Sequence, residues 1–472
     1  KDSKITELPM RRRLGRVFNF FVRMLTPLSQ HDTQCGFKLY PSAIAKQLFG
    51  NLKNGGWAHD TELLVNARLH NVHIEEMPLT WKAMDGSKIN PAIDSFKMFF
   101  QVLMMSLRIK FQWFFVEPIR EFKNGAPAKD SLFRLLFALL AVVLLCMMVF
   151  LSFDYGMTGD ELVQKLYGEK VLNFYTTFGK DRSFMDIKIG FKNNLFYYGG
   201  LYDMICAAAN RYIGHLDEYE MRHVINCIFG FLAMLFCGLL AKRLGSWRTG
   251  FIALLLVACW PQFFGQSMNN PKDIPFAFSY VFGIYYLMLL VQQLPSPNKK
   301  TLVMTTIGLA LAINMRVGGL ILIGMLFAFV IGYYILSKDF RLQLKTQKGA
   351  QGRLMKYLFF ISLIGYIGGL LFWPYGLLGP IDHVRTALKE MAHFDTNIRL
   401  LFNGKSMMSN EVPWNYIPTW LWITTPLVIL YAAIAQLPLM FINRKIFKRE
   451  YSLLLLFATL FPWAYAVYGK SA

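Results

Sequence analysis

Two adjacent carboxylates, Asp160 and Glu161, follow the first long apolar stretch of the chain, residues 131–153. A carboxylate that is ionised at neutral pH can accept the proton of a hydroxyl group while that oxygen attacks another molecule. The same residues also fit a plain helix start, because Thr158-Gly159-Asp160-Glu161 matches the Ser/Thr-x-x-Glu capping box. Asp160 and Glu161 are therefore candidate catalytic residues, with helix capping as the alternative.

A second group of ionisable residues lies further along the chain, in the short segment 267–273. Lys272 and Asp273 stand there directly before an apolar stretch, and ionisable side chains beside a bilayer are costly and often functional. The alternative is a turn at Asn270-Pro271, with Asp273 as the cap of the next helix. Asp273 is a third candidate catalytic residue, and Lys272 is a candidate phosphate ligand.

Two arginines complete this set of candidate residues. Arg222 follows the long polar loop behind Glu161, and Arg316 interrupts the apolar pattern at Asn314-Met315-Arg316. A planar guanidinium group binds phosphate through paired hydrogen bonds, so both are candidate ligands for a lipid phosphate. For Arg316 the alternative is a helix-end arginine that extends its charge to the membrane surface.

The composition indicates a membrane protein, because 55% of the 472 residues are hydrophobic and 16% are aromatic. The net charge of +21 comes from Lys and Arg that lie mainly between apolar stretches and near the start of the chain. This placement is typical of a membrane surface, so we expect the lipid bilayer and not nucleic acid as a partner. The six cysteines include no C-x-x-C pair, so neither a disulfide framework nor a metal knuckle is indicated.

Hydropathy windows of about 20 residues predict a multi-pass α-helical membrane protein. We expect about nine spans, of which the fifth is short enough to be re-entrant. The expected spans are residues 131–153, 222–241, 249–266, 274–294, 301–314, 318–337, 355–374, 418–441 and 451–468.

Loops rich in basic residues alternate along the chain with the other loops. This alternation predicts which side of the membrane each loop of residues 131–472 faces. Lys242, Arg243 and Arg248 fall on the same side as the basic segment 338–356. The positive-inside rule makes this side and the N-terminal region cytoplasmic. The outer loops are then residues 154–221, 267–273 and 375–417. All the candidate residues above share this outer face.

The first outer loop is expected to begin with an amphipathic helix. Leu162, Leu166, Val171 and Phe174 mark its apolar side, while Lys and Glu residues lie elsewhere around it. Such a helix is expected to rest on the outer membrane interface.

Residues 1–95 contain no apolar span, and we expect them to form a cytoplasmic domain. An interfacial helix and linker should follow over residues 96–130, because charged residues interrupt its apolar run. The alternating residues 72–81 predict a β-strand.

Asp60 and Glu62 are the candidate site residues of this N-terminal domain, since a carboxylate can orient or deprotonate an acceptor oxygen. Lys38, Ser87 and Lys88 are candidates to hold a lipid phosphate beside them. The alternatives place Asp60 in the first turn of a helix and Lys88 in a solvated loop.

Four motifs occur in order through this region: DTQCGFKLY at 32–40, GWAHDTELL at 56–64, EMP at 76–78 and GSK at 86–88. The set resembles family 2 glycosyltransferases that make polyprenyl-phosphate sugars. The resemblance implies the C-terminal part of an α/β domain of the GT-A type. It also implies Mg²⁺ or Mn²⁺ held by an Asp-x-Asp motif, which residues 1–95 lack. We expect that motif upstream, so this part should not work alone.

The membrane region resembles the C superfamily (GT-C) of lipid-phosphate-sugar-dependent glycosyltransferases, which includes protein O-mannosyltransferases and aminoarabinose transferases. The resemblance rests on an Asp-Glu pair just past the first span, a long outer loop that returns at Arg222, and an acidic residue, Asp273, in the next outer turn. It implies a polyprenyl-phosphate sugar donor and a hydroxyl or amine acceptor on a glycan, lipid or protein. Asp160 would be the base, although Glu161 or Asp273 could exchange roles with it.

Two other classes remain open from the sequence. The spans could form a lipid-carrier flippase or transporter, or they could merely anchor a polyprenyl-phosphate sugar synthase. We find no internal repeat of the kind that transporters often show, and the acidic residues gather at one surface, which favours an enzyme. We expect a bacterial inner membrane as the location. The sequence does not disclose the sugar, the acceptor or the oligomeric state.

Overall fold

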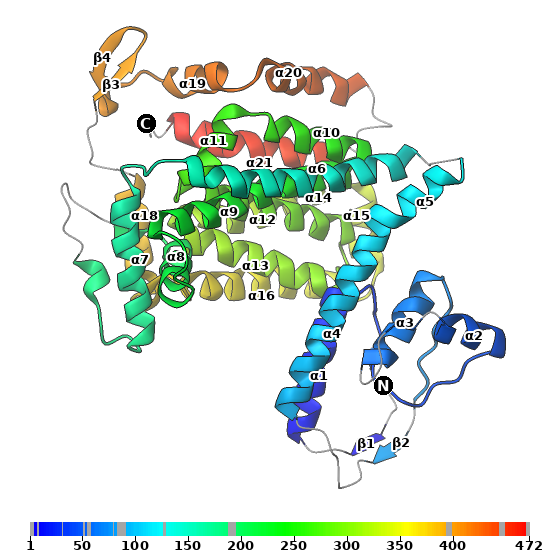
Figure 1. Ribbon diagram of the computed structural model, residues 1–472. Coiled ribbons are helices and arrows are strands. Elements are labelled where there is room, and N and C mark those ends of the chain that lie inside the picture. Colours follow the sequence, from blue (N-terminus) through cyan, green and yellow to red (C-terminus); the bar gives the residue numbers. More distant parts are fainter. Residues whose placement is uncertain are drawn as a thin grey trace. The chain divides into compact units, whose positions relative to one another are not determined.

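The computed structural model describes residues 4–6, 9–30, 32–50, 52–53, 58–78, 80–82, 91–125, 129–186, 195–392, 399–442 and 449–468. The chain divides into two compact units, Lys1–Ser131 and Leu132–Ala472. Figure 1 labels the elements of each unit. The candidate residues Ser87 and Lys88 lie outside the described residues.

The first unit combines helices with one short parallel pair of strands. Its elements are β1 (Lys4–Thr6), α1 (Pro9–Leu25), α2 (Ser42–Gly50), α3 (His59–Leu69), β2 (Thr80–Lys82), α4 (Pro91–Phe111), the π-helix η2 (Gln112–Val116) and α5 (Glu117–Lys123). The register pairs Lys4 with Thr80 and Thr6 with Lys82. Phe18 and Val22 of α1 are buried in one apolar cluster with Val102 and Met105 of α4.

The strand predicted over residues 72–81 is wrong for most of its length. Among the described residues of this segment the strand is confined to Thr80–Lys82, which pairs in parallel with the three residues of β1. Val72 and Ile74 instead pack against the buried side chains of α2 and α3. Val72 and Ile74 are therefore partly buried without lying in a strand.

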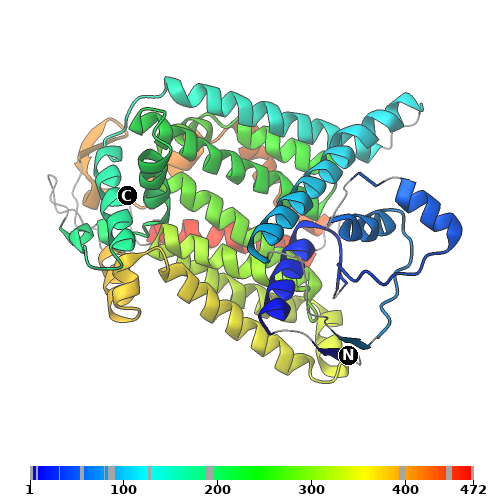
Figure 2. The ribbon, with the colours of Figure 1, turned by 60° about the horizontal axis from the view of Figure 1, so that its bottom comes forward.

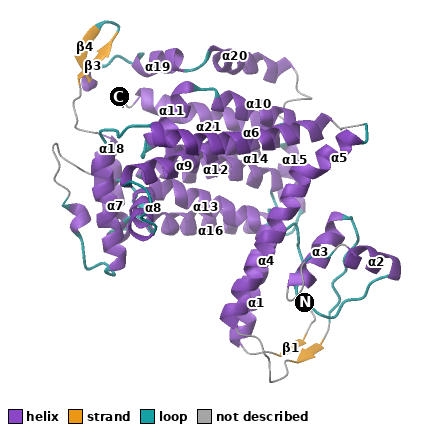
Figure 3. Ribbon diagram, viewed as in Figure 1, coloured by secondary structure: helices purple, strands orange, loops and turns teal. Residues whose placement is uncertain are grey.

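Helices make up nearly all of the second unit, and its strands among the described residues are the hairpin β3 (Arg399–Phe402) and β4 (Lys405–Met408) (Figure 3). Short helical turns occur at η3 (Ser152–Asp154), η4 (Ser183–Met185), η5 (Leu195–Tyr197), η6 (Val317–Leu320) and η7 (Ser409–Glu411). The α-helices are α6 (Lys129–Leu151), α7 (Glu161–Thr176), α8 (Leu201–Tyr212), α9 (Glu218–Leu244), α10 (Trp247–Ala258), α11 (Pro261–Asn269), α12 (Asp273–Gln293), α13 (Lys299–Met315), α14 (Ile321–Leu336), α15 (Lys338–Thr346), α16 (Ala350–Leu370), α17 (Pro374–Leu378), α18 (Asp382–Ala392), α19 (Tyr416–Thr424), α20 (Leu427–Ile442) and α21 (Arg449–Tyr468).

Several of these helices suit a bilayer, as an integral membrane protein requires. Among the described residues, five apolar helices are long enough to cross a membrane, and the number rises to seven if each of two bent pairs is one span. The five are Asp130–Asp154, Glu218–Leu244, Asp273–Gln293, Val317–Leu336 and Ala350–Leu370. The predicted count of about nine stays a prediction.

The predicted span 249–266 is not one straight helix. It is divided into α10 and α11, which meet at a bend of 70°. Trp260 between them has an extended backbone, as the residue before a proline prefers, and Pro261 begins α11. The bend directs α11 toward the turn that carries Lys272 and Asp273.

The core of the second unit lies among α12, α13, α14 and α16, where Leu287, Leu309 and Phe329 are fully buried. In Figures 1 and 2, α7, α8 and α18 gather at one end of this bundle, here called the loop end, while α15 lies at the other. The predicted outer loops thus share one end, and the basic segment with α15 lies at the opposite end. This arrangement agrees with the predicted alternation of loops.

Residues 195–200 fasten the first long loop to the bundle. Gly200 donates its N–H to the carbonyl of Phe372 at 3.1 Å, and the indole of Trp373 donates to the carbonyl of Phe196 at 2.8 Å. Gly199 passes so close to the end of α13 that a Cβ there would lie 1.8 Å from the backbone oxygen of Asn314.

Replacing Gly199 with Ala is therefore expected to destabilise the protein by about 1–3 kcal/mol. The backbone at residue 199 and the backbone at Asn314 must move apart to make room for the added Cβ. Thermal unfolding in detergent would measure the loss. Gly324→Ala is the matched control, since its added Cβ meets nothing within 4 Å and it lies inside α14. Equal melting temperatures for the two variants would contradict the close approach at Gly199.

Candidate functional site

Two ion pairs lie side by side at the loop end. Lys272 Nζ is 2.9 Å from Asp160 Oδ2, and a guanidinium nitrogen of Arg316 is 2.7 Å from Asp273 Oδ1. Asp160 directly precedes α7, Lys272 and Asp273 begin α12, and Arg316 ends α13. The fold thus brings together four predicted site residues from three distant parts of the sequence.

Tyr198 joins the two ion pairs. The centre of its ring is 5.5 Å from Lys272 Nζ and 5.5 Å from the guanidinium carbon of Arg316, within the range of cation–π attraction. Its backbone bridges to that of Arg316, and its carbonyl accepts a hydrogen bond from the hydroxyl of Tyr167 at 3.0 Å. Sequence reasoning missed Tyr198, whose only signal was an aromatic run in the long loop.

Asn270 shapes the turn that presents Lys272 and Asp273. Its Oδ1 accepts the N–H of Lys272 at 3.2 Å and that of Asp273 at 2.9 Å, and its Nδ2 donates to Asp273 Oδ2 at 3.0 Å. Asparagine commonly makes such turns with the backbone two residues on. The turn predicted at Asn270-Pro271 is confirmed, but Lys272 is the N-cap of α12 and Asp273 is its first residue, so the alternative of a cap at Asp273 is wrong.

The adjacent carboxylates Asp160 and Glu161 have different surroundings. Asp160 occupies the N-cap position of α7, but its side chain makes no cap hydrogen bond and is 65% exposed beside Lys272. The Glu161 side chain is 1% exposed and accepts the N–H of Thr158 at 2.7 Å, with His223 Nε2 at 3.0 Å. The capping hydrogen bond predicted by the motif is therefore made by Glu161 and not by Asp160.

Hydrogen bonds also connect the turn before α7 to the end of α11. The hydroxyl of Thr158 donates to the carbonyl of Asn269 at 3.3 Å, and Asn269 Nδ2 donates to the carbonyl of Gly156 at 2.9 Å. The segment that carries Asp160 is thereby held against the segment that carries Lys272.

Arg222 lies deeper than the other predicted cations. Its guanidinium donates to Asp203 Oδ1 at 2.6 Å, the Arg222 side chain is 1% exposed, and its guanidinium carbon is 5.7 Å from the centre of the Tyr202 ring. Burial raises the pKa of the Asp203 carboxyl to about 6, although Arg222 and Lys272 lower it. Sequence reasoning missed Asp203, because one acidic residue in the first turn of α8 reads as an ordinary helix start.

The apolar side predicted for the first loop helix is partly buried within the loop itself. Val171 and Phe174 of α7 pack in a buried cluster with Phe184 and Leu195, whereas Leu162 is exposed. This face is therefore covered largely by protein. The predicted contact with the membrane interface stays a prediction for Leu162.

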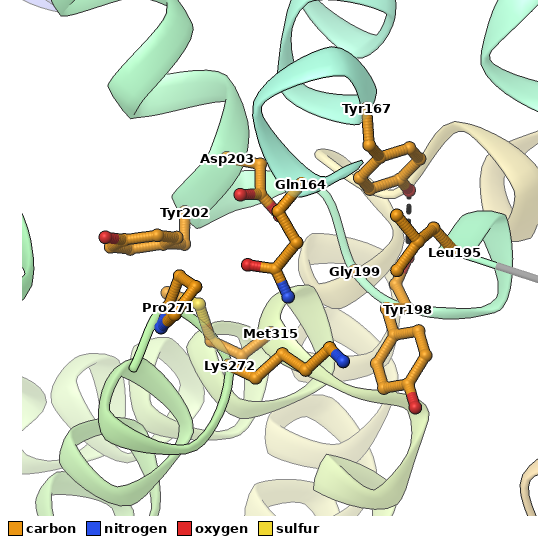
Figure 4. Close-up of a pocket in the computed structure, with 10 residues that line it drawn as sticks. All are labelled: Gln164, Tyr167, Leu195, Tyr198, Gly199, Tyr202, Asp203, Pro271, Lys272 and Met315. Carbon is orange, nitrogen blue, oxygen red and sulfur yellow. Dashed lines mark hydrogen bonds between the residues drawn. The ribbon is translucent and has the colours of Figure 1, made fainter. Parts of the chain in front are cut away.

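A small, water-sized pocket has Lys272 and Tyr198 in its wall (Figure 4). Gln164, Tyr198, Tyr202, Asp203 and Lys272 are among the residues that line it. Lys272 therefore contacts Asp160 with its ammonium group and also forms part of the pocket wall.

In the first unit, the predicted site residues form two ion pairs. Lys38 Nζ is 2.5 Å from Asp60 Oδ1, and Arg108 binds Glu62, whose side chain is almost fully buried. Asp60 lies in the first turn of α3, where a negative charge is favourable, but Ala58 is the N-cap. Lys38 and Asp60 remain candidate site residues, whereas the partner of Glu62 points to a structural role.

The residues that the structure describes contain no recognisable metal site. They include no group of three or more His, Cys, Asp or Glu that could hold an ion. In the first unit Asp60 and Glu62 are each engaged by a cation, so these two carboxylates do not form a metal site. The expected Mg²⁺ or Mn²⁺ stays a prediction about an Asp-x-Asp motif upstream of Lys1.

Comparison with known proteins finds one likeness in the membrane region and another in the N-terminal region. Residues 138–368 match the family described as dolichyl-phosphate-mannose-protein mannosyltransferase. The N-terminal region is similar to dolichyl-phosphate beta-glucosyltransferases. Both predicted resemblances are confirmed.

Identity to the N-terminal relatives is substantial but local. The protein of Saccharomyces cerevisiae is 44% identical over 82 residues, which cover 17% of this chain and 23% of the relative. The human protein is 36% identical over 91 residues, 19% of this chain and 28% of the relative. The chain thus spans between 23% and 28% of the length of these relatives. No solved structure matches the chain.

Proposed function

We propose that this protein is a membrane glycosyltransferase that moves a sugar from a polyprenyl-phosphate carrier to an acceptor hydroxyl or amine. The observation that carries the proposal is the cluster of Asp160, Lys272, Asp273 and Arg316 at the loop end of an apolar helical bundle. The match of residues 138–368 to a mannosyltransferase family supports it. The acceptor is a glycan, lipid or protein.

Asp160 is assigned the role of general base. Its Oδ2 contacts Lys272, and no described residue donates a hydrogen bond to its Oδ1. Both oxygens of Asp273, in contrast, are engaged, one by Arg316 and one by Asn270. Asp160 therefore has an oxygen available for the proton of an acceptor, and Asp273 orients the cation beside it.

The transfer then follows from one displacement. The acceptor oxygen attacks the anomeric carbon of the sugar while Asp160 takes its proton, and the configuration inverts. The bond between that carbon and the phosphate oxygen breaks, and its electron pair leaves on the phosphate. The growing negative charge is stabilised by cations in a site of low dielectric.

Lys272 and Arg316 are the cations best placed for that phosphate. Their side chains are 24% and 30% exposed, so a ligand can reach them, whereas Arg222 is buried against Asp203. We therefore assign the phosphate to Lys272 and Arg316. Arg222 was predicted to bind the lipid phosphate, and we propose instead that it holds Asp203 in place.

The N-terminal region is proposed to be part of a cytoplasmic synthase that loads sugar onto the lipid carrier. Its likeness to dolichyl-phosphate beta-glucosyltransferases supports this role, and the pair of Lys38 and Asp60 offers a cation for the carrier phosphate. The basic segment with α15 at the end opposite Asp160 supports a cytoplasmic position for that end. The bacterial inner membrane stays a prediction.

Sugar transfer by the purified full-length protein tests the proposal. The protein in lipid vesicles would receive polyprenyl-phosphate mannose or polyprenyl-phosphate glucose together with peptide, glycan and lipid acceptors. We expect a glycosylated acceptor and free polyprenyl phosphate in equal amounts. Movement of the donor across the bilayer without any transfer would instead support the flippase alternative. If the protein shows neither transfer nor movement of the donor, the spans serve only as an anchor.

A further inference from the structure

The pocket beside Lys272 contains a polar side chain whose hydrogen-bonding capacity is not satisfied. Gln164 of α7 is 2% exposed, and its Oε1 has no hydrogen-bond partner among the described residues. Figure 4 shows its amide directed into the space bordered by Tyr198, Tyr202 and Lys272, with the carboxylate of Asp203 beside it.

A buried amide oxygen without a donor costs about 1–3 kcal/mol, so such a group normally has a partner when the protein works. The pocket is water-sized, which matches one hydroxyl group and not a whole sugar ring. A hydroxyl can donate one hydrogen bond and accept others, which suits an amide and a carboxylate together.

The charge balance of the pocket favours a neutral group. Asp203 supplies a carboxylate, but Arg222 lies 2.6 Å from it and compensates its charge. An ammonium group in the pocket would face Lys272 without a free negative charge to offset the repulsion. A neutral hydroxyl avoids this repulsion.

The pocket also lies at the right place for the donor sugar. Lys272 lines it and is 2.9 Å from Asp160, the proposed base. A sugar whose anomeric carbon lies near Asp160 therefore has ring hydroxyls within reach of the pocket mouth.

We infer that Gln164 and Asp203 form a subsite that binds one hydroxyl group of the donor sugar and so helps to select the sugar. The inference rests on the proposed glycosyl transfer. The hydroxyl donates to Gln164 Oε1 or to the Asp203 carboxylate and accepts from the amide of Gln164. A donor that lacks this one hydroxyl leaves the amide oxygen of Gln164 unpaired and is a poor substrate.

The test compares donors that each lack one hydroxyl. Full-length protein would be assayed with polyprenyl-phosphate mannose and its 2-, 3-, 4- and 6-deoxy analogues. We expect wild type to use one analogue with a kcat/KM about 100-fold lower than that of the others. Gln164→Met, which keeps the side-chain length, should reduce this difference to about tenfold or less and leave the ranking of the other analogues unchanged.

Gln343→Met on the exposed side of α15 is the matched control and should preserve the wild-type pattern. A uniform fall for all donors with Gln164→Met, together with a lower melting temperature, would mean a structural amide bound to water and would overturn the subsite. Altered selection among acceptors and not donors would also overturn it. If wild type transfers sugar neither from polyprenyl-phosphate mannose nor from polyprenyl-phosphate glucose, the proposed function itself fails, and the subsite fails with it.

Discussion

Replacing Asp160 with Asn is expected to lower kcat for sugar transfer by about 100- to 10,000-fold, the usual contribution of a positioned general base. The amide keeps the shape of the side chain but cannot take the acceptor proton. The side chain is exposed and makes no cap hydrogen bond, so the fold should persist. Initial rates at saturating donor and acceptor, with melting temperatures alongside, would measure the effect.

The chemistry of the acceptor separates a base from a mere contact. A more acidic acceptor hydroxyl needs less help with its proton, so a fluorinated alcohol acceptor should suffer less from Asp160→Asn than an ordinary one. Asp339→Asn in α15, also exposed, is the matched control and should leave the rate unchanged. A near wild-type rate for Asp160→Asn, or an equal loss with both acceptors, would exclude the assigned role.

Glu161→Gln provides a second comparison at the neighbouring position. Glu161 is buried between Thr158 and His223, so its loss should act through the position of the 156–160 turn. We expect a lower melting temperature together with a lower rate, and the same loss with both acceptors.

Much of the membrane architecture was predictable because it depends on composition along the chain. Continuous apolar runs predicted α6, α9, α12, α14 and α16. A helix forms there because it satisfies the hydrogen bonds of its own backbone N–H and C=O groups within lipid. The placement of Lys and Arg predicted which loops share an end. Neither signal requires knowledge of which helix contacts which.

The bend between α10 and α11 and the loss of the 72–81 strand were not predicted. Pro261 is compatible with either a continuing helix or a new one, and the packing of α11 near the site decides between them. A strand needs a partner along its length, and the sequence alone did not show that the described pairing with β1 covers three residues.

The candidate site was predictable in part, for a similar reason. Residue types and loop order placed Asp160, Lys272, Asp273 and Arg316 on one face, and the structure brings these four together. The separate roles of Asp160 and Glu161 depend on the direction of each side chain, which adjacent positions in a sequence do not reveal. Asp203 was missed because its importance comes entirely from tertiary contacts.

Removing the partner of Asp203 should have the largest effect on stability. Arg222→Met leaves a buried carboxylate without its guanidinium, and breaking such a pair costs about 3–5 kcal/mol. Replacing both residues, as Arg222→Met with Asp203→Leu, removes the buried charge altogether and should return the melting temperature close to that of wild type. Thermal unfolding at one scan rate would compare the three proteins.

The pH dependence of Arg222→Met gives an independent check. Burial already raises the pKa of Asp203 to about 6, and Arg222 lowers it, so losing Arg222 raises that pKa further. Between about pH 4, where an unfolded Asp titrates, and the raised pKa, the native state binds more protons than the unfolded chain. Stability from this group therefore falls as pH rises through that window.

The deficit of Arg222→Met against wild type should accordingly shrink as pH is lowered from 7 to 5, while the double variant shows no such recovery. A single variant as stable as wild type at every pH, with only its affinity for the lipid phosphate reduced, would return Arg222 to the role of a phosphate ligand. A double variant as unstable as the single one would show that the guanidinium matters for its packing against Tyr202 and not for the charge of Asp203. The two residues are thus separable by stability measurements alone, before any substrate is identified.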